Sequence, residues 1–490
     1  SSGGLTIDNS TAENNATIYT ISESPRDGDV IWVGTDDGYV QVTENGGATW
    51  RNVTAAIPGV PEGTWVSRVT ASPHDRAAAW VTFDGHRTGD MATYVYRTTD
   101  LGRTWERLPT DGVEGYAWVI VEDPERPGLL YLGTEFGLWI SLDGGASWAR
   151  FEGGIPKRVA VHDIVVHPDE ADLIVATHGR GIYILDDLTP LRALTPEVLE
   201  EKAALLPSRP ARMVTPAQVQ EWVGDDEFVG DTPEEAAAIT FWQKRRHLFG
   251  DLKVEVYGPD GERIATLPAP KRKGLNRVSW PMRLKPPKVP PASSLIPAFL
   301  GPRVPEGTYT VKLIKGKDVL EGTVTLVADP RSPHSAEDRK LQQETALALY
   351  RDLERLAYTI DTVIQLRDAA RERAEGAPKR LARRLEAYAD ELEAFRASLV
   401  ATGEGGMLSG EEKLREKLGE LYGAVSGYDG RPTGSQLERK ARLERELEAA
   451  AARFAGLTGE RLADLNRRLE RRGLAPLEVQ TREAWEAAQE

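Results

Sequence analysis

The fold is decided by the stretch Thr43-Glu44-Asn45-Gly46-Gly47-Ala48-Thr49-Trp50 and by its two later copies, Thr98-Thr99-Asp100-Leu101-Gly102-Arg103-Thr104-Trp105 and Ser141-Leu142-Asp143-Gly144-Gly145-Ala146-Ser147-Trp148. All three follow the pattern S/T-x-D/N-x-G-x-T/S-W. The Asp or Asn accepts hydrogen bonds from the backbone of its own turn, and the Gly two positions later tolerates a positive φ. The Trp buries a large apolar surface between neighbouring sheets. Three copies in phase predict the blades of a β-propeller.

These copies, which we call boxes, are expected to be structural rather than catalytic. Their Asp and Asn side chains are needed by the turns, and their Trp rings are expected to lie in the core. The structural box residues are Asn45, Trp50, Asp100, Trp105, Asp143 and Trp148.

A longer repeat of roughly 45–50 residues surrounds the boxes, which is a period typical of four-stranded blades. Four segments align on a strand, a turn and a second apolar strand, with the second strands beginning near Val30, Ala79, Leu129 and Asp172. The fourth segment ends at Asp187 without a box. The sequence therefore predicts four visible blades within residues 1–190, in a propeller that is incomplete.

The position of the boxes gives the predicted blades a polarity. If each box joins strands three and four, the loops between strands two and three lie at the opposite face, where propellers usually hold a ligand. That face is predicted to carry a ligand site made of Asp36, Asp37, Asp84, His86, Arg87, Glu135, His162, Asp163, His178 and Arg180. The alternative is that these Asp-Gly and His-Gly steps only shape tight turns.

Paired carboxylates on this face would suit glycoside hydrolysis if their separation were right. The candidates for such a catalytic pair are Asp84, Asp36 and Glu135. The sequence contains no H-E-x-x-H, P-loop or G-x-S-x-G motif. His162, Asp163 and His178 lack a fixed metal-ligand spacing, so we expect neither a metal nor a cofactor.

The composition of the chain excludes several kinds of partner and site. The 490 residues carry a net charge of -15, so the chain lacks the broad basic footprint of a nucleic-acid binder, and we expect no nucleic-acid partner. It has no cysteine, which excludes disulfides and cysteine nucleophiles. No apolar run of about 18 residues suggests a transmembrane segment.

The rest of the chain changes character twice. Residues 191–238 are predicted to be a mixed connector. Alternating β-rich runs with turn signals predict an Ig-like β-sandwich over residues 239–330. Leucines at three- to four-residue spacing predict a helical bundle or long hairpin over residues 331–490. The fold class is thus mainly β plus α.

The boxes resemble the Asp-box of sialidases, sortilin-type receptors and tandem-propeller xyloglucanases. Together with stretches such as Thr82-Phe83-Asp84-Gly85-His86-Arg87 and Thr177-His178-Gly179-Arg180-Gly181, the whole order resembles a bacterial family of sortilin-like, BNR-repeat proteins that are often labelled glycosyl hydrolases. The resemblance implies that this chain corresponds to the C-terminal half of a longer protein. Further blades would then come from an N-terminal half or from another protein.

Two functions follow as hypotheses. The first is an extracytoplasmic binding protein, extracellular or periplasmic, that holds a peptide or glycan on the face opposite the boxes. The second is a glycoside hydrolase that cleaves a polysaccharide through paired carboxylates on that face. The chain begins at Ser1 rather than Met, so we expect a processed or truncated N-terminus.

Overall fold

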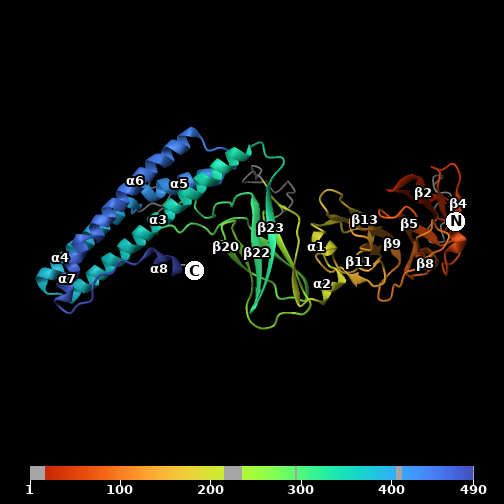
Figure 1. The fold of residues 1–490 in the computed structure, drawn as a ribbon, viewed down its shortest axis with the longest axis horizontal. Helices are drawn as coiled ribbons and strands as arrows, with labels where there is room; N and C mark the ends of the chain where they lie inside the picture. The colour runs from red at the N-terminus through yellow and green to blue at the C-terminus, as the bar shows by residue number, and fades with distance from the viewer. Residues whose placement is uncertain (1–16, 215–233, 293–294, 404–410, 489–490) are drawn as a thin grey trace. The chain divides into compact units, whose positions relative to one another are not determined.

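The computed structural model describes residues 17–214, 234–292, 295–403 and 411–488 (Figure 1). Residues 1–16 of the predicted propeller and residues 215–233 of the predicted connector lie outside these ranges. The chain forms two compact units. The first comprises residues 1–209, 240–249 and 271–276, and the second comprises residues 210–239, 250–270 and 277–490.

The first unit begins with four antiparallel sheets whose strands pair in chain order. Three sheets have four strands and the fourth has three, as expected for successive propeller blades. Their strands are β1 (Ile18–Ser24), β2 (Asp27–Thr35), β3 (Val40–Thr43) and β4 (Arg51–Asn52); β5 (Trp65–Ala71), β6 (Ala79–Asp84), β7 (Tyr94–Thr98) and β8 (Glu106–Arg107); β9 (Ala117–Glu122), β10 (Leu130–Thr134), β11 (Gly137–Ser141) and β12 (Ala149–Arg150); and β13 (Val161–Val166), β14 (Leu173–Thr177) and β15 (Ile182–Leu185).

Each box joins the third and fourth strands of its sheet, as the sequence predicts. In the third box, Asp143 Oδ1 accepts hydrogen bonds from Ser141 Oγ at 2.7 Å and from the Ser147 N–H at 2.9 Å. Its Oδ2 accepts from Ser147 Oγ at 2.6 Å. The Gly145 N–H donates to Ser141 Oγ at 2.8 Å, so the side chains of Ser141, Asp143 and Ser147 hold their own turn. The boxes built on Asn45 and Asp100 repeat this network.

The box tryptophans are not equally buried, and the expectation that all three lie in the core is wrong for Trp50. Trp105 is buried and meets Trp32 of the preceding blade edge to face at 5.9 Å. Trp148 reaches back in the same way and donates its indole N–H to Pro109 O at 3.0 Å. Trp50 is 41% exposed, because among the described residues no blade precedes its own.

Hydroxyl side chains tie the first strands of neighbouring blades together. The Val69 N–H donates to Thr20 Oγ1 at 3.2 Å, which links β5 to β1. Ser67 Oγ and Thr70 Oγ1 each donate at 2.8 Å to a backbone carbonyl of β9, Ala117 O and Ile120 O. Strands β1, β5, β9 and β13 are therefore adjacent in space, which makes them the inner strands of a β-propeller-like fold.

Two short helices cover the fourth blade. They are α1 (Thr189–Arg192) and α2 (Pro196–Glu200), and α2 begins where Thr195 caps the Val198 N–H. Leu191 packs with Ile164 and Leu173 of the blade in one buried cluster. The chain then enters a three-stranded sheet of β16 (Ala203–Leu206), β18 (Ala237–Gln243) and β21 (Gly274–Trp280).

The second unit contains a five-stranded sheet in the order β17-β23-β22-β19-β20. Strands β19 and β20 form an antiparallel hairpin around Gly258–Gly261, and β17 runs parallel to β23. The five strands are β17 (Ala211–Met213), β19 (Leu252–Tyr257), β20 (Arg263–Pro268), β22 (Gly307–Lys315) and β23 (Asp318–Ala328).

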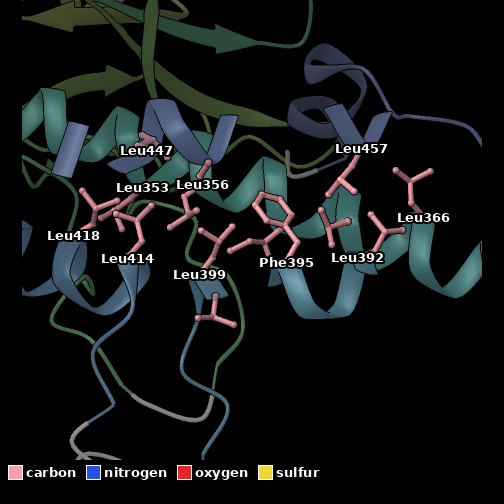
Figure 2. Packing of buried hydrophobic residues seen from close by; sticks show 14 of the residues in the cluster. Leu353, Leu356, Leu366, Leu392, Phe395, Leu399, Leu414, Leu418, Leu447 and Leu457 are labelled. Atoms are coloured by element: carbon pink, nitrogen blue, oxygen red, sulfur yellow. The ribbon is translucent and has the colours of Figure 1, made fainter. Parts of the chain in front are cut away.

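The chain ends in helices, as its leucine spacing predicts. They are α3 (Ala336–Glu375), α4 (Lys379–Leu399), α5 (Leu414–Ser426), α6 (Gly434–Thr458), α7 (Glu460–Glu470) and α8 (Arg482–Ala487). The 40-residue α3 begins where Ser335 caps the Asp338 N–H, and it contacts α4, α5 and α6. Leucines of these helices, among them Leu353, Leu392 and Leu418, share one buried core (Figure 2). In the described part of the chain, no helix is long and apolar enough to cross a membrane.

The box network yields a stability prediction. Asp100→Ala removes three hydrogen bonds made with Thr98 and Thr104, so it should lower the free energy of unfolding of the first unit by about 1–2 kcal/mol. Asp100→Asn should lower the free energy of unfolding less, because Asn45 makes the equivalent hydrogen bonds in the first box. Thermal and urea unfolding would measure both changes.

A matched control is Asp111→Ala, which removes an exposed loop carboxylate. The backbone N–H of Thr104 is the main cause that holds the pKa of Asp100 below 3.8. The contribution of this carboxylate is therefore fully present above pH 3.8 and is lost as the pH falls through the folded-state pKa. Equal unfolding curves for Asp100→Ala and Asp111→Ala would contradict this role.

Candidate functional site

One irregularity recurs in all four inner strands. At the same point of each strand, one residue is skipped in the pairing with the second strand of its blade. The skipped residues are Tyr19, Ser67, Trp118 and His162. A β-bulge of this kind re-aims the side chains around it. The bulge therefore gives each blade one distinctive position near the start of its inner strand.

The second strands end at equivalent residues beside these bulges. The N–H groups of Asp36, Glu135 and His178 donate to the backbone carbonyls of Thr17, Tyr116 and Ala160, at 3.2, 3.1 and 2.9 Å. Asp84 holds the same place in the second blade, where it pairs with Trp65. The four loops thus lie at one end of the propeller, opposite the boxes.

Five rings from three blades form a continuous row, which we call the ring row. His86 stacks on Tyr116 with ring centroids 4.6 Å apart and planes 14° apart. Tyr116 meets Trp118 at 5.4 Å, Trp118 meets His162 at 4.1 Å, and His162 meets His178 at 5.0 Å. Two bulge residues, Trp118 and His162, form the centre of this row.

Two carboxylates hold one end of the ring row in place. The buried Asp84 contacts His86 Nδ1 with both oxygens, at 2.6 and 2.7 Å. An ionised carboxylate can only accept, so this contact favours a proton on Nδ1 of His86. The Tyr116 hydroxyl donates to Glu135 Oε2 at 2.7 Å. Burial first, and this hydrogen bond second, raise the pKa of Tyr116, so its hydroxyl stays protonated.

A second aromatic contact lies beside the ring row on the first two blades. The Arg87 guanidinium sits 3.5 Å above the ring of Trp65, a cation–π contact. Tyr19, the bulge residue of the first blade, meets the edge of Trp65 at 4.8 Å. Arg87 is thus engaged with a ring rather than with a carboxylate.

An ion pair joins two inner strands that are not neighbours. Arg68 Nη2 lies 2.7 Å from Asp163 Oδ1, and both side chains are partly exposed. Each residue directly follows the bulge of its strand, in the second and fourth blades. The pair therefore bridges β5 and β13 past β9, close to the propeller axis.

The structure brings together most of the residues predicted from the sequence. Asp84, His86, Glu135, His162 and His178 build or brace the ring row, while Arg87 and Asp163 make the neighbouring contacts described above. Asp36, Asp37 and Arg180 do not join it: Asp36 accepts from the Thr17 N–H, Asp37 accepts from the Thr35 hydroxyl, and Arg180 is exposed. The two aspartates thus shape their own turn, as the alternative interpretation held for such residues.

The predicted site does not include Tyr116, Trp118 or Arg68, each of which contacts residues of that site in the structure. The signal was available in the repeat, because Tyr116 aligns with Trp65 and Trp118 aligns with His162 once the four inner strands are superposed in sequence. The Arg68–Asp163 pair could not be found in this way, since simple strand alternation ignores the bulge.

The ring row is an aromatic surface whose neighbouring rings are inclined to one another by 14° to 61°. Burial, followed by the nearby His178, lowers the pKa of His162 below its ordinary value of 6.5, although Glu135 and Asp84 act in the opposite direction. His162 is therefore neutral at pH 7. In the residues the structure describes, no group of three or more His, Asp and Glu side chains has an arrangement that could hold a metal ion.

Comparisons with known proteins find local and partial similarity. No protein-family model matches the chain. A stretch of 100 residues is 32% identical to the oligoxyloglucan-reducing end-specific xyloglucanase of Emericella nidulans. The match covers 19% of this chain and 11% of that enzyme.

Among solved structures, the GH74 xyloglucanase from Xanthomonas campestris is 17% identical, with 64% of this chain and 46% of that chain covered and a TM-score of 0.29. YCF48 from Cyanidioschyzon merolae is 18% identical, with 35% and 53% covered and a TM-score of 0.28. The propeller description rests instead on the strand pairing of the chain's own sheets.

The His162–His178 contact yields a titration prediction. In an NMR titration, His162 should protonate with a midpoint below 6.5, and His178→Ala should raise that midpoint, because it removes a neighbouring charge and part of the burial. As the pH falls below 6.5, the unfolded chain takes up this proton before the folded chain does, so the contribution of His162 to folding stability decreases.

His167→Ala is the matched control, since His167 lies in the turn between β13 and β14, at the other end of the same blade. It should leave the His162 midpoint in place. A midpoint for His162 that His178→Ala does not move would show that the two imidazoles are uncoupled.

Proposed function

We propose that this chain is a ligand-binding module whose ring row holds a glycan or peptide on the propeller face opposite the boxes. The observation that supports this most is the row itself: five rings from three blades in stacked, tilted or edge-to-face contact, with two carboxylates and the Tyr116 hydroxyl bonded at one end. Ligand sites are commonly apolar and aromatic surfaces with a few polar groups that fix orientation. The partly exposed rings of Trp118 and His162 would offer apolar faces to the C–H side of a sugar ring.

A glycan is the ligand we favour. Asp84 and Glu135 keep their polar atoms turned to His86 and Tyr116, so the row offers stacking area more than charge. The 100-residue match to a xyloglucanase points to the same class of ligand. An extended peptide is the other candidate, and its aromatic or proline side chains would use the same surface.

Glycoside hydrolysis is the alternative function, and the xyloglucanase match is what favours it. Of the three candidate catalytic carboxylates, Asp36 serves its turn, Asp84 orients His86, and Glu135 accepts from Tyr116. A hydrolase would have to use Asp84 or Glu135 in spite of these bonds. The Asp84→Asn and Glu135→Gln variants described below therefore distinguish binding from hydrolysis.

We further propose that this module is part of a larger propeller. Its end blades expose apolar side chains on their sheets, Tyr19 and Ile21 in β1 and Val165, Ile182 and Ile184 in the fourth blade, which supports a propeller completed by further blades. This agrees with the C-terminal half of a sortilin-like, BNR-repeat protein acting outside the cytoplasm.

The proposed domains remain 1–190, 191–238, 239–330 as an Ig-like sandwich, and 331–490. The contact of Trp280 in β21 with Tyr309 in β22 at 5.1 Å supports the sandwich.

The ring row yields a binding prediction. Glycan-array screening followed by calorimetry with xyloglucan oligosaccharides should detect binding that Trp118→Ala weakens about tenfold, since burial of such a ring contributes roughly 1.5 kcal/mol. Trp118→Phe should retain most of the affinity. Trp50→Ala, which removes an exposed tryptophan from the box face, should leave the affinity unchanged.

Asp84→Asn and Glu135→Gln separate binding from hydrolysis. If the module only binds, no reducing ends are released by the wild type or by either variant. Release that disappears in one of these variants would establish the hydrolase. Binding to peptides alone, with the same response to Trp118→Ala, would reassign the ligand and keep the site.

A further inference from the structure

A cationic and apolar surface lies on the first unit, away from the ring residues in sequence and built independently of them. It consists of two segments that flank neighbouring strands: residues 244–249 follow β18, and residues 271–273 precede β21. The His247 N–H donates to Lys271 O at 3.1 Å, and Gln243 Nε2 donates to Arg272 O at 3.1 Å. We call these two joined segments the basic tip.

The basic tip concentrates positive charge on a chain whose net charge is -15. Six of its nine residues are cationic: Lys244, Arg245, Arg246, Lys271, Arg272 and Lys273. Glu200 neutralises Lys244 at 2.6 Å. Arg245, Arg246, Arg272 and Lys273 are exposed, so the tip presents a local positive field to solvent.

Apolar side chains stand beside these cations. Phe249 is 86% exposed and Leu248 is 66% exposed. An open pocket lies among the cations of the basic tip: its lining residues are Leu199 and Trp242 together with Lys244, Arg245, Arg246 and Lys273. The surface thus combines exposed apolar groups with a cationic surround.

We propose that the basic tip docks the protein onto an anionic phospholipid surface. Lipid phosphates would meet the arginine and lysine side chains, while Leu248 and Phe249 would enter the interfacial layer between headgroups and acyl chains. Basic residues attract anionic lipid within a Debye length of the surface, and an amphipathic element is retained there by burying its apolar side chains. A soluble polyanion would satisfy the cations but would leave Leu248 and Phe249 in water, so the lipid surface is the better match.

Vesicle sedimentation of the full chain tests the proposal. Vesicles of phosphatidylcholine with about one third phosphatidylglycerol should bind the protein, and pure phosphatidylcholine vesicles should not. Arg245→Gln with Arg246→Gln should weaken the partition about 25-fold, which is about fivefold for each cation removed near the surface. Phe249→Ser should weaken it about tenfold at both low and high salt, since apolar insertion is not screened.

Two matched controls use residues elsewhere in the chain. Arg471→Gln with Arg472→Gln removes another adjacent pair of exposed arginines, and Phe299→Ser removes another exposed phenylalanine, 69% accessible. Both should bind vesicles like the wild type. Equal binding to neutral vesicles, unchanged binding by the Arg245 and Arg246 variant, or binding of polyphosphate but not of vesicles would each overturn the proposal.

Discussion

The bulge shared by the four inner strands is the constraint on which the proposed site depends. A regular strand would alternate its side chains strictly between the two faces of a blade, where neighbouring blades cover them. Skipping one residue breaks that alternation just before the strand enters the blade interior. In the third and fourth blades the skipped residues are Trp118 and His162, and their rings touch at 4.1 Å. In the second blade the position is Ser67, whose hydroxyl donates instead to Ala117 O of β9. The same backbone device therefore places a ring in one blade and a strand-to-strand tie in another.

The boxes and the bulges lie at opposite ends of the blades, and the two ends have different roles. At the box end, short Asp, Asn, Ser and Thr side chains satisfy their own turns, as in the bonds between Asp143 and Ser147. At the other end, the side chains that follow the second strands differ from blade to blade: Asp36, Asp84, Glu135 and His178. Binding residues often lie on loops that a rigid scaffold holds in place. Different side chains at equivalent backbone positions fit that arrangement.

The repeat made much of the fold predictable, and local irregularity made part of the site unpredictable. Box spacing predicts the strand order, and Asp84, Glu135 and His178 lie at equivalent positions beside the starts of the inner strands. Leucine spacing likewise identified the terminal helices. What periodicity could not provide were the effects of neighbours: among the described residues no blade precedes that of Trp50, so its ring is exposed, whereas Trp105 and Trp148 rest on a preceding blade. The pairing of Arg68 with Asp163 also depends on two bulges in separate blades, and no pattern within a single strand encodes it.

The bonding of the carboxylates bears on whether this face catalyses or binds. A general acid in glycoside hydrolysis needs a carboxyl group whose proton is available to the glycosidic oxygen, and its partner needs a free oxygen for water or for the anomeric carbon. Asp84 is buried and directs both oxygens to His86 Nδ1, and Glu135 already accepts from a tyrosine that stays protonated. Both groups therefore act on rings, fixing the orientation of His86 and Tyr116 before any ligand arrives. Preorganised rings lose little conformational entropy on binding, so these bonds favour the proposed use of this face as a stacking surface.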